Sequence, residues 1–479
     1  MPDLVLFNTL GRQLTRFEPI EPGVARMYTC GPTVYNDVHI GNLRTFMFED
    51  LLRRSLRYLG YRVVQVMNVT DVDDKTIRGA HQAGISLDEY TEPFIASFLR
   101  DLDILHIERA EHFPRATHHI AEIIALIARL VERGFAYETD GSVFFSIARD
   151  GDYGRLSGFD LAQVRRGERV ASDEYAKEDV RDFVLWKGVK PGEPAWESPW
   201  GPGRPGWHVE CSAMSMKYLG ESFDLHCGGV DLIFPHHENE IAQSESATGH
   251  PFVNTWVHSE HLIVDGQKMS KSLGNQYTLK DLMDRGYAPR ALRYALLAVH
   301  YRQKLNFSFE GLDAAAGALR RVDEMRFRLT HSEDPARKTT EPRLAETLAK
   351  LPRDFAAALA DDLNIAAALA ALFIFVKEVN VAVEERRLGP GDKERILAAL
   401  ADADRVLGLL DPATWPAAAA PGHQATAEAE NEEIEGLIQA RKEARQRRDF
   451  AASDRIRDEL AGRGILLEDT PQGTRWKRR

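Results

Sequence analysis

Three short segments of the chain contain residue types and spacings that could do chemistry. The segment TCGPTVYNDVHIGN places Cys30, one of only three cysteines, nine residues before His39. The segment KMSKS, which begins at Lys268, places two lysines three residues apart. The segment PHHENE places His236 four residues before Glu240. These side chains suit two tasks, the coordination of a metal ion and the binding of a phosphate chain.

The tetrad HIGN, from His39 to Asn42, stands where a phosphate-binding helix start is expected. It follows a strand-like run and a Gly-Pro turn, and it opens a helical pattern. A helix N-terminus attracts phosphate because its backbone N–H groups and its dipole point at the ligand. His39 can donate a hydrogen bond to a phosphate oxygen, and Gly41 lets a flat ligand approach the backbone. The alternative is that His39 and Asn42 only cap a helix.

The KMSKS segment favours the binding of a triphosphate. Lys268 and Lys271 can bring two mobile ammonium groups to it from a loop rich in glycine and serine. A basic surface loop is the alternative, which the presence of HIGN earlier in the same chain disfavours. Another segment, GPGRPG, matches the dinucleotide-binding fingerprint. We expect it to be a loop, because Pro202 and Pro205 have no N–H to offer a pyrophosphate.

The PHHENE segment raises a metal hypothesis. If Pro235 opens a helix, His236 and Glu240 share one face, and this spacing suits two ligands of one ion. His237 could replace His236 only by pairing with Ile241, which cannot ligate. A solvated helix start is the alternative.

The cysteines alone do not decide the metal hypothesis. Cys30 and Cys211 are far apart in sequence and the chain has no CxxC pair, so their spacing does not indicate zinc. Cys227, in HCGGVD, is the other possible thiolate. We expect it to be a small buried residue beside Gly228 and Gly229.

The elements that must position these residues are predicted from hydrophobic periodicity. ARMYTC is typical of a buried strand, RTFMFEDLLRRSLRYLG of an amphipathic helix ending at Gly60, and YRVVQVMNVTD of a second strand. This order predicts a parallel sheet, in which ligands collect at the carboxyl ends of the strands. Cys30 lies at the first such end and Thr70 at the second. Two later runs, SFDLHCGGVDLIF and TWVHSEHLIVDG, continue the sheet-like pattern.

Composition restricts the class of protein. A length of 479 residues predicts two to four domains. The formal net charge of -12 disfavours general nucleic-acid binding. Residues 441–479, however, carry about twelve basic and about seven acidic residues, which indicates a local polyanion contact or a solvated helical face. Few cysteines, no signal peptide and no apolar run of membrane-spanning length predict a cytoplasmic protein.

The motifs together resemble those of a known family. HIGN and KMSKS are similar to the two signatures of class I aminoacyl-tRNA synthetases. YTCGPTVYNDVHIGN, GWHVECSAMS, FPHHENEIAQS and KMSKSLGN further resemble the cysteinyl-tRNA synthetase family, and the order of helical bundle, linker and basic end extends the likeness to the whole chain. Asn42 is a departure, because the fourth position of the signature is usually histidine.

The resemblance implies an α/β fold with a Rossmann-type parallel-sheet catalytic domain, an inserted connective domain, an α-helical bundle and a small basic C-terminal domain. We expect the following division: residues 1–113 and 200–250, catalytic domain; 114–199, connective domain; 251–313, KMSKS-bearing stem-contact region; 314–411, helical bundle; 412–430, linker; 431–479, anticodon-binding domain.

The resemblance also implies a ligand set. It implies one zinc ion per chain, held in the amino-acid pocket by Cys30, Cys211, His236 and Glu240. Further positions line the cysteine pocket (Thr70, Trp207, Asp231) or let adenosine approach the backbone (Gly228, Gly229). The alternatives are helix capping for Thr70 and core packing for Trp207. For tRNA we expect contacts from Arg475, Trp476 and Lys477.

The function implied is a two-step acyl transfer. Cysteine and ATP, with Mg²⁺, would form cysteinyl-adenylate, and the acyl group would pass to the 3′ end of tRNA(Cys). The catalytic residues implied are His39, Asn42, Lys268 and Lys271. The alternatives are a ligase that passes cysteine to an amino sugar, and a silent tRNA-binding paralogue. We expect a monomer with no membrane contact.

Overall fold

The computed structural model describes residues 2–158, 182–270, 272–332, 337–415, 436–444, 447, 449–462, 465–470 and 473–478. The chain forms two compact units. The first contains residues 1–279 and 289–415, and the second contains residues 280–288 and 416–479.

The centre of the first unit is a parallel sheet of four strands in the order β10-β9-β3-β4. Its members are β3 (Val24–Thr29), β4 (Arg62–Met67), β9 (Phe223–Gly229) and β10 (Val253–Ser259). The register pairs Thr29 with both Met67 and Cys227, so the carboxyl ends of these strands meet at one edge. The predicted strand–helix–strand order is confirmed, and β10 carries the sheet past the border expected at residue 250.

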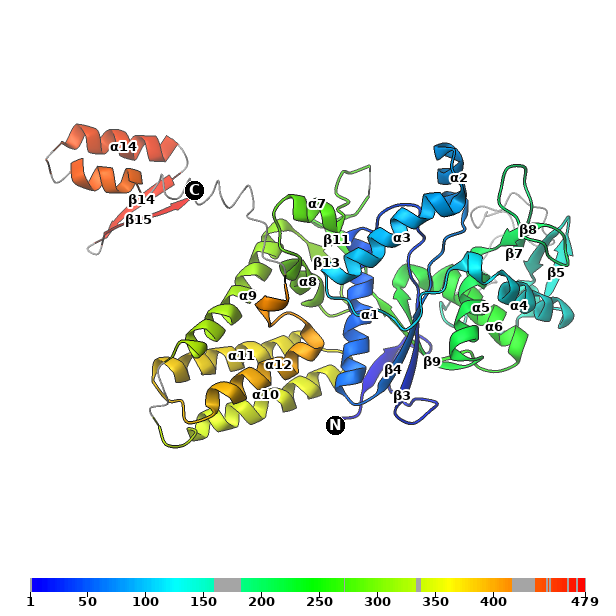
Figure 1. Ribbon diagram of the computed structural model, residues 1–479, viewed down its shortest axis with the longest axis horizontal. Coiled ribbons are helices and arrows are strands. Elements are labelled where there is room, and N and C mark those ends of the chain that lie inside the picture. Colours follow the sequence, from blue (N-terminus) through cyan, green and yellow to red (C-terminus); the bar gives the residue numbers. More distant parts are fainter. Residues whose placement is uncertain are drawn as a thin grey trace. The chain divides into compact units, whose positions relative to one another are not determined.

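Helix α1 (Ile40–Tyr58) connects β3 to β4 and is buried along most of its length. It contacts β4 and β9 on one side and α8, α10 and α12 on the other, as Figure 1 shows. Apolar residues such as Leu43, Met47 and Leu51 face this packing. The start of α1, directly after His39, therefore lies at the carboxyl edge of the sheet.

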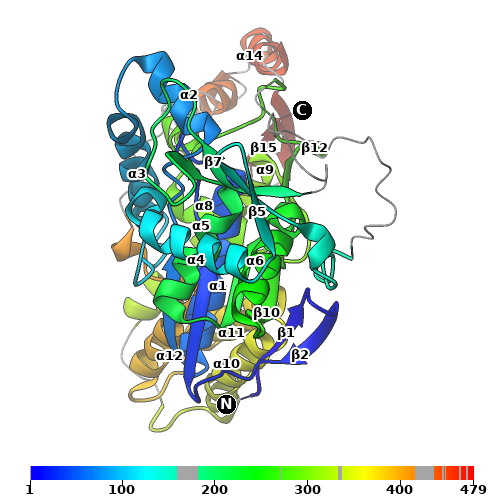
Figure 2. The same cartoon turned by 90° about the vertical axis from the view of Figure 1, so that its right-hand side faces the viewer.

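An inserted region separates β4 from β9. It contains α2 (Asp74–Ala83), α3 (Leu87–Ile104), η1 (Ala116–His118), α4 (Ile120–Glu132), η2 (Ile147–Arg149) and an antiparallel sheet in the order β5-β6-β7-β8. The strands are β5 (Ala136–Thr139), β6 (Ser142–Phe145), β7 (Phe183–Gly188) and β8 (Gly203–Pro205). Helices α5 (Trp207–Leu219) and α6 (Glu238–Thr248) return to the central sheet and pack with α4, as Figure 2 shows.

Strand β8 corrects one prediction from the sequence. Gly203–Pro205 belongs to GPGRPG, which we expected to be a loop, but it pairs with β7. A proline fits here because β8 is the edge strand of its sheet, where a missing N–H breaks no ladder. The sheet of the inserted region therefore extends past the border expected at residue 199.

The remaining elements of the first unit precede or follow the central sheet in the sequence. Small sheets are formed by β1 (Val5–Asn8) with β2 (Gln13–Arg16), and by β12 (Gln267–Lys268), β11 (Leu262–Val264) and β13 (Leu305–Phe307). The helices are α8 (Pro289–Leu297), α9 (Phe309–Thr330), α10 (Pro342–Ala360), α11 (Ile365–Glu384), α12 (Asp392–Leu407) and η6 (Pro412–Thr414). Helix α7 (Leu279–Asp284) begins at the border of the two units.

Helix α11 corrects a second prediction. Its mean hydropathy reaches 1.9, so by length and composition it could cross a membrane, although we expected no such segment. It packs against α9 and α10, and its buried face includes Leu369, Leu372 and Val376. A helix that packs one apolar face in a bundle can reach the hydropathy of a membrane span.

The second unit contains α14 (Phe450–Gly462) and a hairpin of β14 (Ile465–Thr470) and β15 (Gly473–Arg478). Figure 1 labels α14, β14 and β15, which have the colours at the red end of the bar.

A buried ion pair ties α8 to α1. Arg293, which is 0% exposed, donates to Asp50 Oδ2 at 2.7 Å and to Leu407 O at 2.7 Å. Burial opposes the charge of Asp50, but Arg54 and Arg293 outweigh burial and hold its pKa below the usual value. This contribution to stability is present above about pH 4 and is lost as the pH falls further.

We expect Arg293→Met to lower the free energy of unfolding by about 3 kcal/mol, because it removes one of the two arginines that pair with the buried Asp50. Urea denaturation at pH 7 measures the change. The exposed Arg353, replaced in the same way, should change stability by less than about 1 kcal/mol. Equal effects of the two substitutions would contradict the prediction.

Candidate active site

Four side chains from three places in the sequence meet beside the carboxyl edge of the central sheet. Cys30 follows β3, Cys211 lies on α5, His236 lies in η5 (Ile233–His237), and Glu240 lies on α6. One ligand atom from each lies within 4.8 Å of all the others, and all four residues are buried. His236 Nε2 is 3.1 Å from Glu240 Oε1, as expected for residues four apart on one helix face.

The charges of this cluster fit a metal site. The hydrogen bond with Cys30 lowers the pKa of Cys211 to about 6, against the effect of burial, and burial raises the pKa of Cys30. Burial lowers the pKa of His236, but Cys211 and Glu240 outweigh burial and raise it to about 10. Two sulfurs, one imidazole and one carboxylate form a donor set that zinc accepts. The residues present therefore fit the ion that the resemblance implies.

A second donor set, not found from the sequence, overlaps the first. His226 on β9 and His237 share Cys30 and Glu240 with it. His226 Nε2 is 2.9 Å from Glu240 Oε2, and His237 Nε2 is 3.3 Å from Cys30 Sγ. His237 therefore has possible metal-binding neighbours other than its helix partner Ile241, because Cys30 follows β3 and His226 lies on β9. A histidine inside the apolar run FDLHCGG was the available signal.

Two of the three residues predicted for the cysteine pocket are held by specific contacts. Thr70 is buried after β4, where its N–H donates to Pro32 O, so it does not cap a helix. The indole of Trp207 is 39% exposed and stacks on His236 with ring centroids 4.4 Å apart. The core-packing alternative for Trp207 is therefore wrong. Asp231 is exposed in η4 (Val230–Leu232).

The glycines at the end of β9 lie close to that turn. A Cβ added at Gly229 would clash with Asp231 Oδ1. A Cβ added at Gly228 would lie 2.9 Å from Leu232 Cδ1. Cys227, in contrast, is buried in the strand and belongs to neither donor set among the described residues.

The HIGN tetrad caps α1 with its own side chains. His39 Nδ1 accepts from the N–H of Asn42 at 3.2 Å, and His39 N–H donates to Asn42 Oδ1 at 3.2 Å. The capping alternative is thus correct, but it does not exclude phosphate binding. Because His39 Nδ1 accepts, the neutral ring carries its proton on Nε2, and the amide of Asn42 keeps Nδ2 as a donor.

The KMSKS segment contacts the start of α1. A Cβ added at Gly41 would lie 2.7 Å from Met269 Cε, and Ile40 N–H donates to Tyr277 O at 2.9 Å. Lys268 is exposed, and its carbonyl accepts from Asn275 Nδ2 at 3.3 Å. Lys271 lies outside the described residues. The two signatures, far apart in sequence, therefore form one surface.

Comparison with known proteins agrees with this geometry. Three family models match: the catalytic domain of class I (C) tRNA synthetases over residues 16–317, the DALR domain over 354–411, and the cysteinyl-tRNA ligase anticodon binding domain over 428–476. The cysteine–tRNA ligase of Solibacter usitatus is 47% identical and that of Chlamydia muridarum 46%, each aligned over 99% of this chain and 100% of its own length. The chain belongs to the cysteinyl-tRNA synthetase family.

The class I fold is also shared with more distant synthetases. Mycobacterium tuberculosis methionyl-tRNA synthetase in complex with methionyl-adenylate matches with a TM-score of 0.56 at 16% identity, over 81% of this chain and 90% of that one. The α/β fold class predicted from the sequence is confirmed.

Of the residues predicted to contact tRNA, Arg475 and Trp476 lie in the part that matches the family's anticodon-binding domain, and Lys477 follows directly after it. Arg475, Trp476 and Lys477 belong to β15, and the register pairs Trp476 with Leu467 of β14. Their side chains lie outside the described residues, so their contacts stay a prediction.

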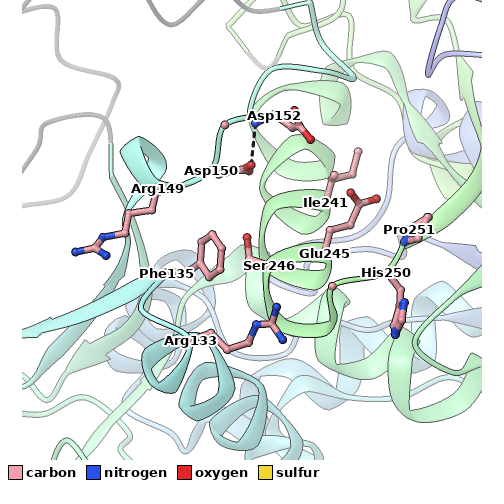
Figure 3. A pocket seen from close by; sticks show the side chains of 12 residues that line it. Arg133, Phe135, Arg149, Asp150, Asp152, Ile241, Glu245, Ser246, His250 and Pro251 are labelled. Atoms are coloured by element: carbon pink, nitrogen blue, oxygen red, sulfur yellow. Dashed lines mark hydrogen bonds between the residues drawn. The ribbon is translucent and has the colours of Figure 1, made fainter.

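A separate pocket of about 400 Å³ lies beside the C-terminal half of α6. Figure 3 shows it between α6 and the inserted region, with Phe135 facing Ser246 and Glu245. Glu245 accepts from Arg155 at 2.8 Å. Among the described residues, none of those predicted for zinc, cysteine or ATP lines this pocket.

Proposed function

We propose that the protein activates L-cysteine with ATP and transfers the cysteinyl group to the 3′ end of tRNA(Cys). The observation that carries the proposal is the meeting of Cys30, Cys211, His236 and Glu240 in one buried cluster, together with the contact of HIGN with Met269. Cys30 and His39 lie on one segment. A single turn therefore joins the half of the site that would bind the thiol to the half that would bind the phosphates.

The thiol-binding half would hold one zinc ion. Zinc, when bound, supplies a Lewis acid that prefers a thiolate to a hydroxyl and favours ionisation of the thiol that it binds. Apolar contacts alone separate near-isosteric substrates by only about 1 to 3 kcal/mol, which is too little to reject serine. Trp207, stacked on His236, would cover the apolar side of the substrate.

In the first step, a carboxylate oxygen of cysteine attacks the α-phosphorus of ATP, and the bond from that phosphorus to the pyrophosphate oxygen breaks. The Nε2–H of His39, the Nδ2 of Asn42, Lys268 and Lys271 would stabilise the charge on the phosphates, with Mg²⁺ bound to ATP. In the second step, a ribose hydroxyl of tRNA attacks the acyl carbon and AMP leaves. No protein nucleophile is needed.

One assay tests the proposal against its alternatives. Purified protein is given ATP and cysteine, with serine as the control amino acid and either tRNA(Cys) or an amino sugar as acceptor. We expect cysteine-dependent pyrophosphate exchange and charging of tRNA only. Charging of the amino sugar, or no exchange at all, would reject the proposed function.

The C-terminal domain should serve tRNA and not activation. We expect removal of residues 431–479 to raise the KM for tRNA by at least about 10-fold, since loss of one stacked base alone costs about 1–3 kcal/mol. Cysteine-dependent pyrophosphate exchange should survive, because residues 1–279 and 289–415 form a compact unit by themselves. Collapse of exchange in the truncated protein would show that this division of labour is wrong.

We also propose that the protein works as a cytoplasmic monomer without membrane contact. The packing of one face of α11 against α9 and α10 supports the absence of a membrane span. Light scattering of the purified protein would measure its oligomeric state.

A further inference from the structure

Two cations of the inserted sheet converge on one carboxylate at the start of α2. Asp74, the first residue of α2, accepts from Lys187 Nζ at 2.9 Å through Oδ2 and from Arg204 through Oδ1. Arg204 also donates from Nε to Glu193 Oε2 at 2.8 Å. The side chains of Arg204 and Lys187 are only 4% and 12% exposed, so both cations are held in place. These ion pairs tie the edge of the sheet β5-β6-β7-β8 to α2.

The pairing of the two strands explains why a carboxylate is needed at this point. The register places Lys187 of β7 directly opposite Arg204 of β8, so two positive side chains share one face of the sheet. Like charges in this position destabilise a pair of strands. Burial opposes the charge of Asp74, but Lys187 and Arg204 outweigh burial and lower its pKa to about 2. Asp74 is therefore charged at neutral pH and compensates both cations.

Strand β8 leads directly into the residue that stacks on His236. Gly206, which follows β8, donates from its N–H to Leu185 O at 2.8 Å, and α5 begins with Trp207. A Cβ added at Gly206 would lie 2.2 Å from Val184 O, so the two backbones are in close contact here. The indole of Trp207 stacks on the ring of His236 with centroids 4.4 Å apart. The position of this indole therefore depends on the position of the inserted sheet.

The same turn of α2 also contacts the segment that carries Cys30 and His39. Lys75 Nζ lies 4.8 Å from the ring centroid of Tyr35, which stands between those two residues in the sequence. A cation over the face of an aromatic ring is attracted to it. Asp74 and Lys75 are adjacent, so the first turn of α2 joins the inserted sheet to the segment between Cys30 and His39.

We propose that Asp74 is a positioning residue for the activation of cysteine. Through its two ion pairs it holds the inserted sheet against α2, and the sheet in turn keeps Trp207 over the cysteine site. The inference rests on the proposed function, in which Trp207 covers the apolar side of the substrate. Loss of Asp74 should weaken the use of cysteine and leave the use of ATP nearly unchanged, because the HIGN tetrad is held by its own cap.

Pyrophosphate exchange by the zinc-loaded protein separates the two substrates. Asp74→Asn should raise the KM for cysteine by about 10-fold. A misplacement of about 1 Å can cost about 100-fold, and a half-exposed ion pair is weaker than a buried one. The KM for ATP should change by less than about 3-fold. Asp88→Asn, the same change at an exposed acid in the first turn of α3, is the matched control and should leave both KM values within about 2-fold.

A double-mutant cycle tests whether Asp74 acts through the inserted sheet. Lys187→Met removes one of the two ion pairs and should raise the KM for cysteine by about 3-fold. Adding it to Asp74→Asn should raise this KM no further, because both substitutions remove the same contact. A double variant whose KM rises by the product of the two single effects would overturn the inference, since the two residues would then act independently.

Zinc content and thermal melting separate this role from a general loss of structure. Melting shows which variants are folded, and their zinc content should equal that of the parent. Equal rises in the KM for cysteine and for ATP, loss of zinc from Asp74→Asn, or an unchanged KM for cysteine would each overturn the inference. If Asp74→Asn does not fold, Lys187→Met decides by the same comparison of the two KM values. Cysteine-dependent exchange by the parent protein upholds the proposed function whichever way these variants behave.

Discussion

Replacing Cys211 by serine is expected to remove zinc from the protein and to lower cysteine-dependent pyrophosphate exchange by well over about 100-fold. Loss of a group that merely supports a metal ligand already costs about 10- to 100-fold in affinity or activity, and Cys211 is proposed to be a ligand itself. Its Sγ lies within 4.8 Å of the ligand atoms of Cys30, His236 and Glu240. Metal analysis and exchange assays on the same preparation measure both effects.

Cys227 provides the matched control for this experiment. It is as deeply buried as Cys211, but among the described residues it belongs to neither donor set. Cys227→Ala should therefore keep one zinc per chain and most of the exchange activity. Undiminished zinc in Cys211→Ser, or equal loss of zinc in Cys227→Ala, would contradict the ligand assignment.

The pH dependence of zinc retention follows from the same cluster. Zinc binds thiolate, so protons compete with it as the pH falls. Because the pKa of Cys211 is lowered to about 6, retention against a chelator should weaken most steeply below about pH 6. In Cys227→Ala the profile should be unchanged.

Replacing Asn42 by aspartate is expected to lower kcat for pyrophosphate exchange by about 100- to 1,000-fold, the usual cost of losing one donor to a transition state. Asn42 Oδ1 accepts from His39 N–H at 3.2 Å, and an aspartate oxygen can take over that bond. The substitution therefore keeps the cap of α1 but replaces the Nδ2 donor by a negative oxygen beside the phosphates.

The Asn42→His substitution replaces the Nδ2 donor without adding a negative oxygen. Histidine, the usual residue of the signature, restores a donor at this position, so activity should return to within about 10-fold of the parent. Circular dichroism melting of both variants checks that α1 is intact. An active Asn42→Asp protein would show that the fourth position of HIGN does not donate to the phosphates.

The sequence alone predicted the features that depend on residues close to one another along the chain. The strand–helix–strand order of β3, α1 and β4 follows from periodicity, and the shared face of His236 and Glu240 follows from helical spacing. HIGN and KMSKS were found as short signatures. The capping of α1 by His39 and Asn42 is equally local, which is why it was foreseen as an alternative.

Only the tertiary structure decided which distant residues meet. Cys30 and Cys211 belong to separate segments, and the register of a parallel sheet together with the packing of α5 brings their sulfurs together. The same packing places His226 and His237 in a second donor set. The packing of α11 against α9 and α10 could not be read from its composition, because a bundle helix and a membrane span can be equally apolar. Contacts across a sheet or between helices depend on where whole elements lie, and no single stretch of sequence carries that information.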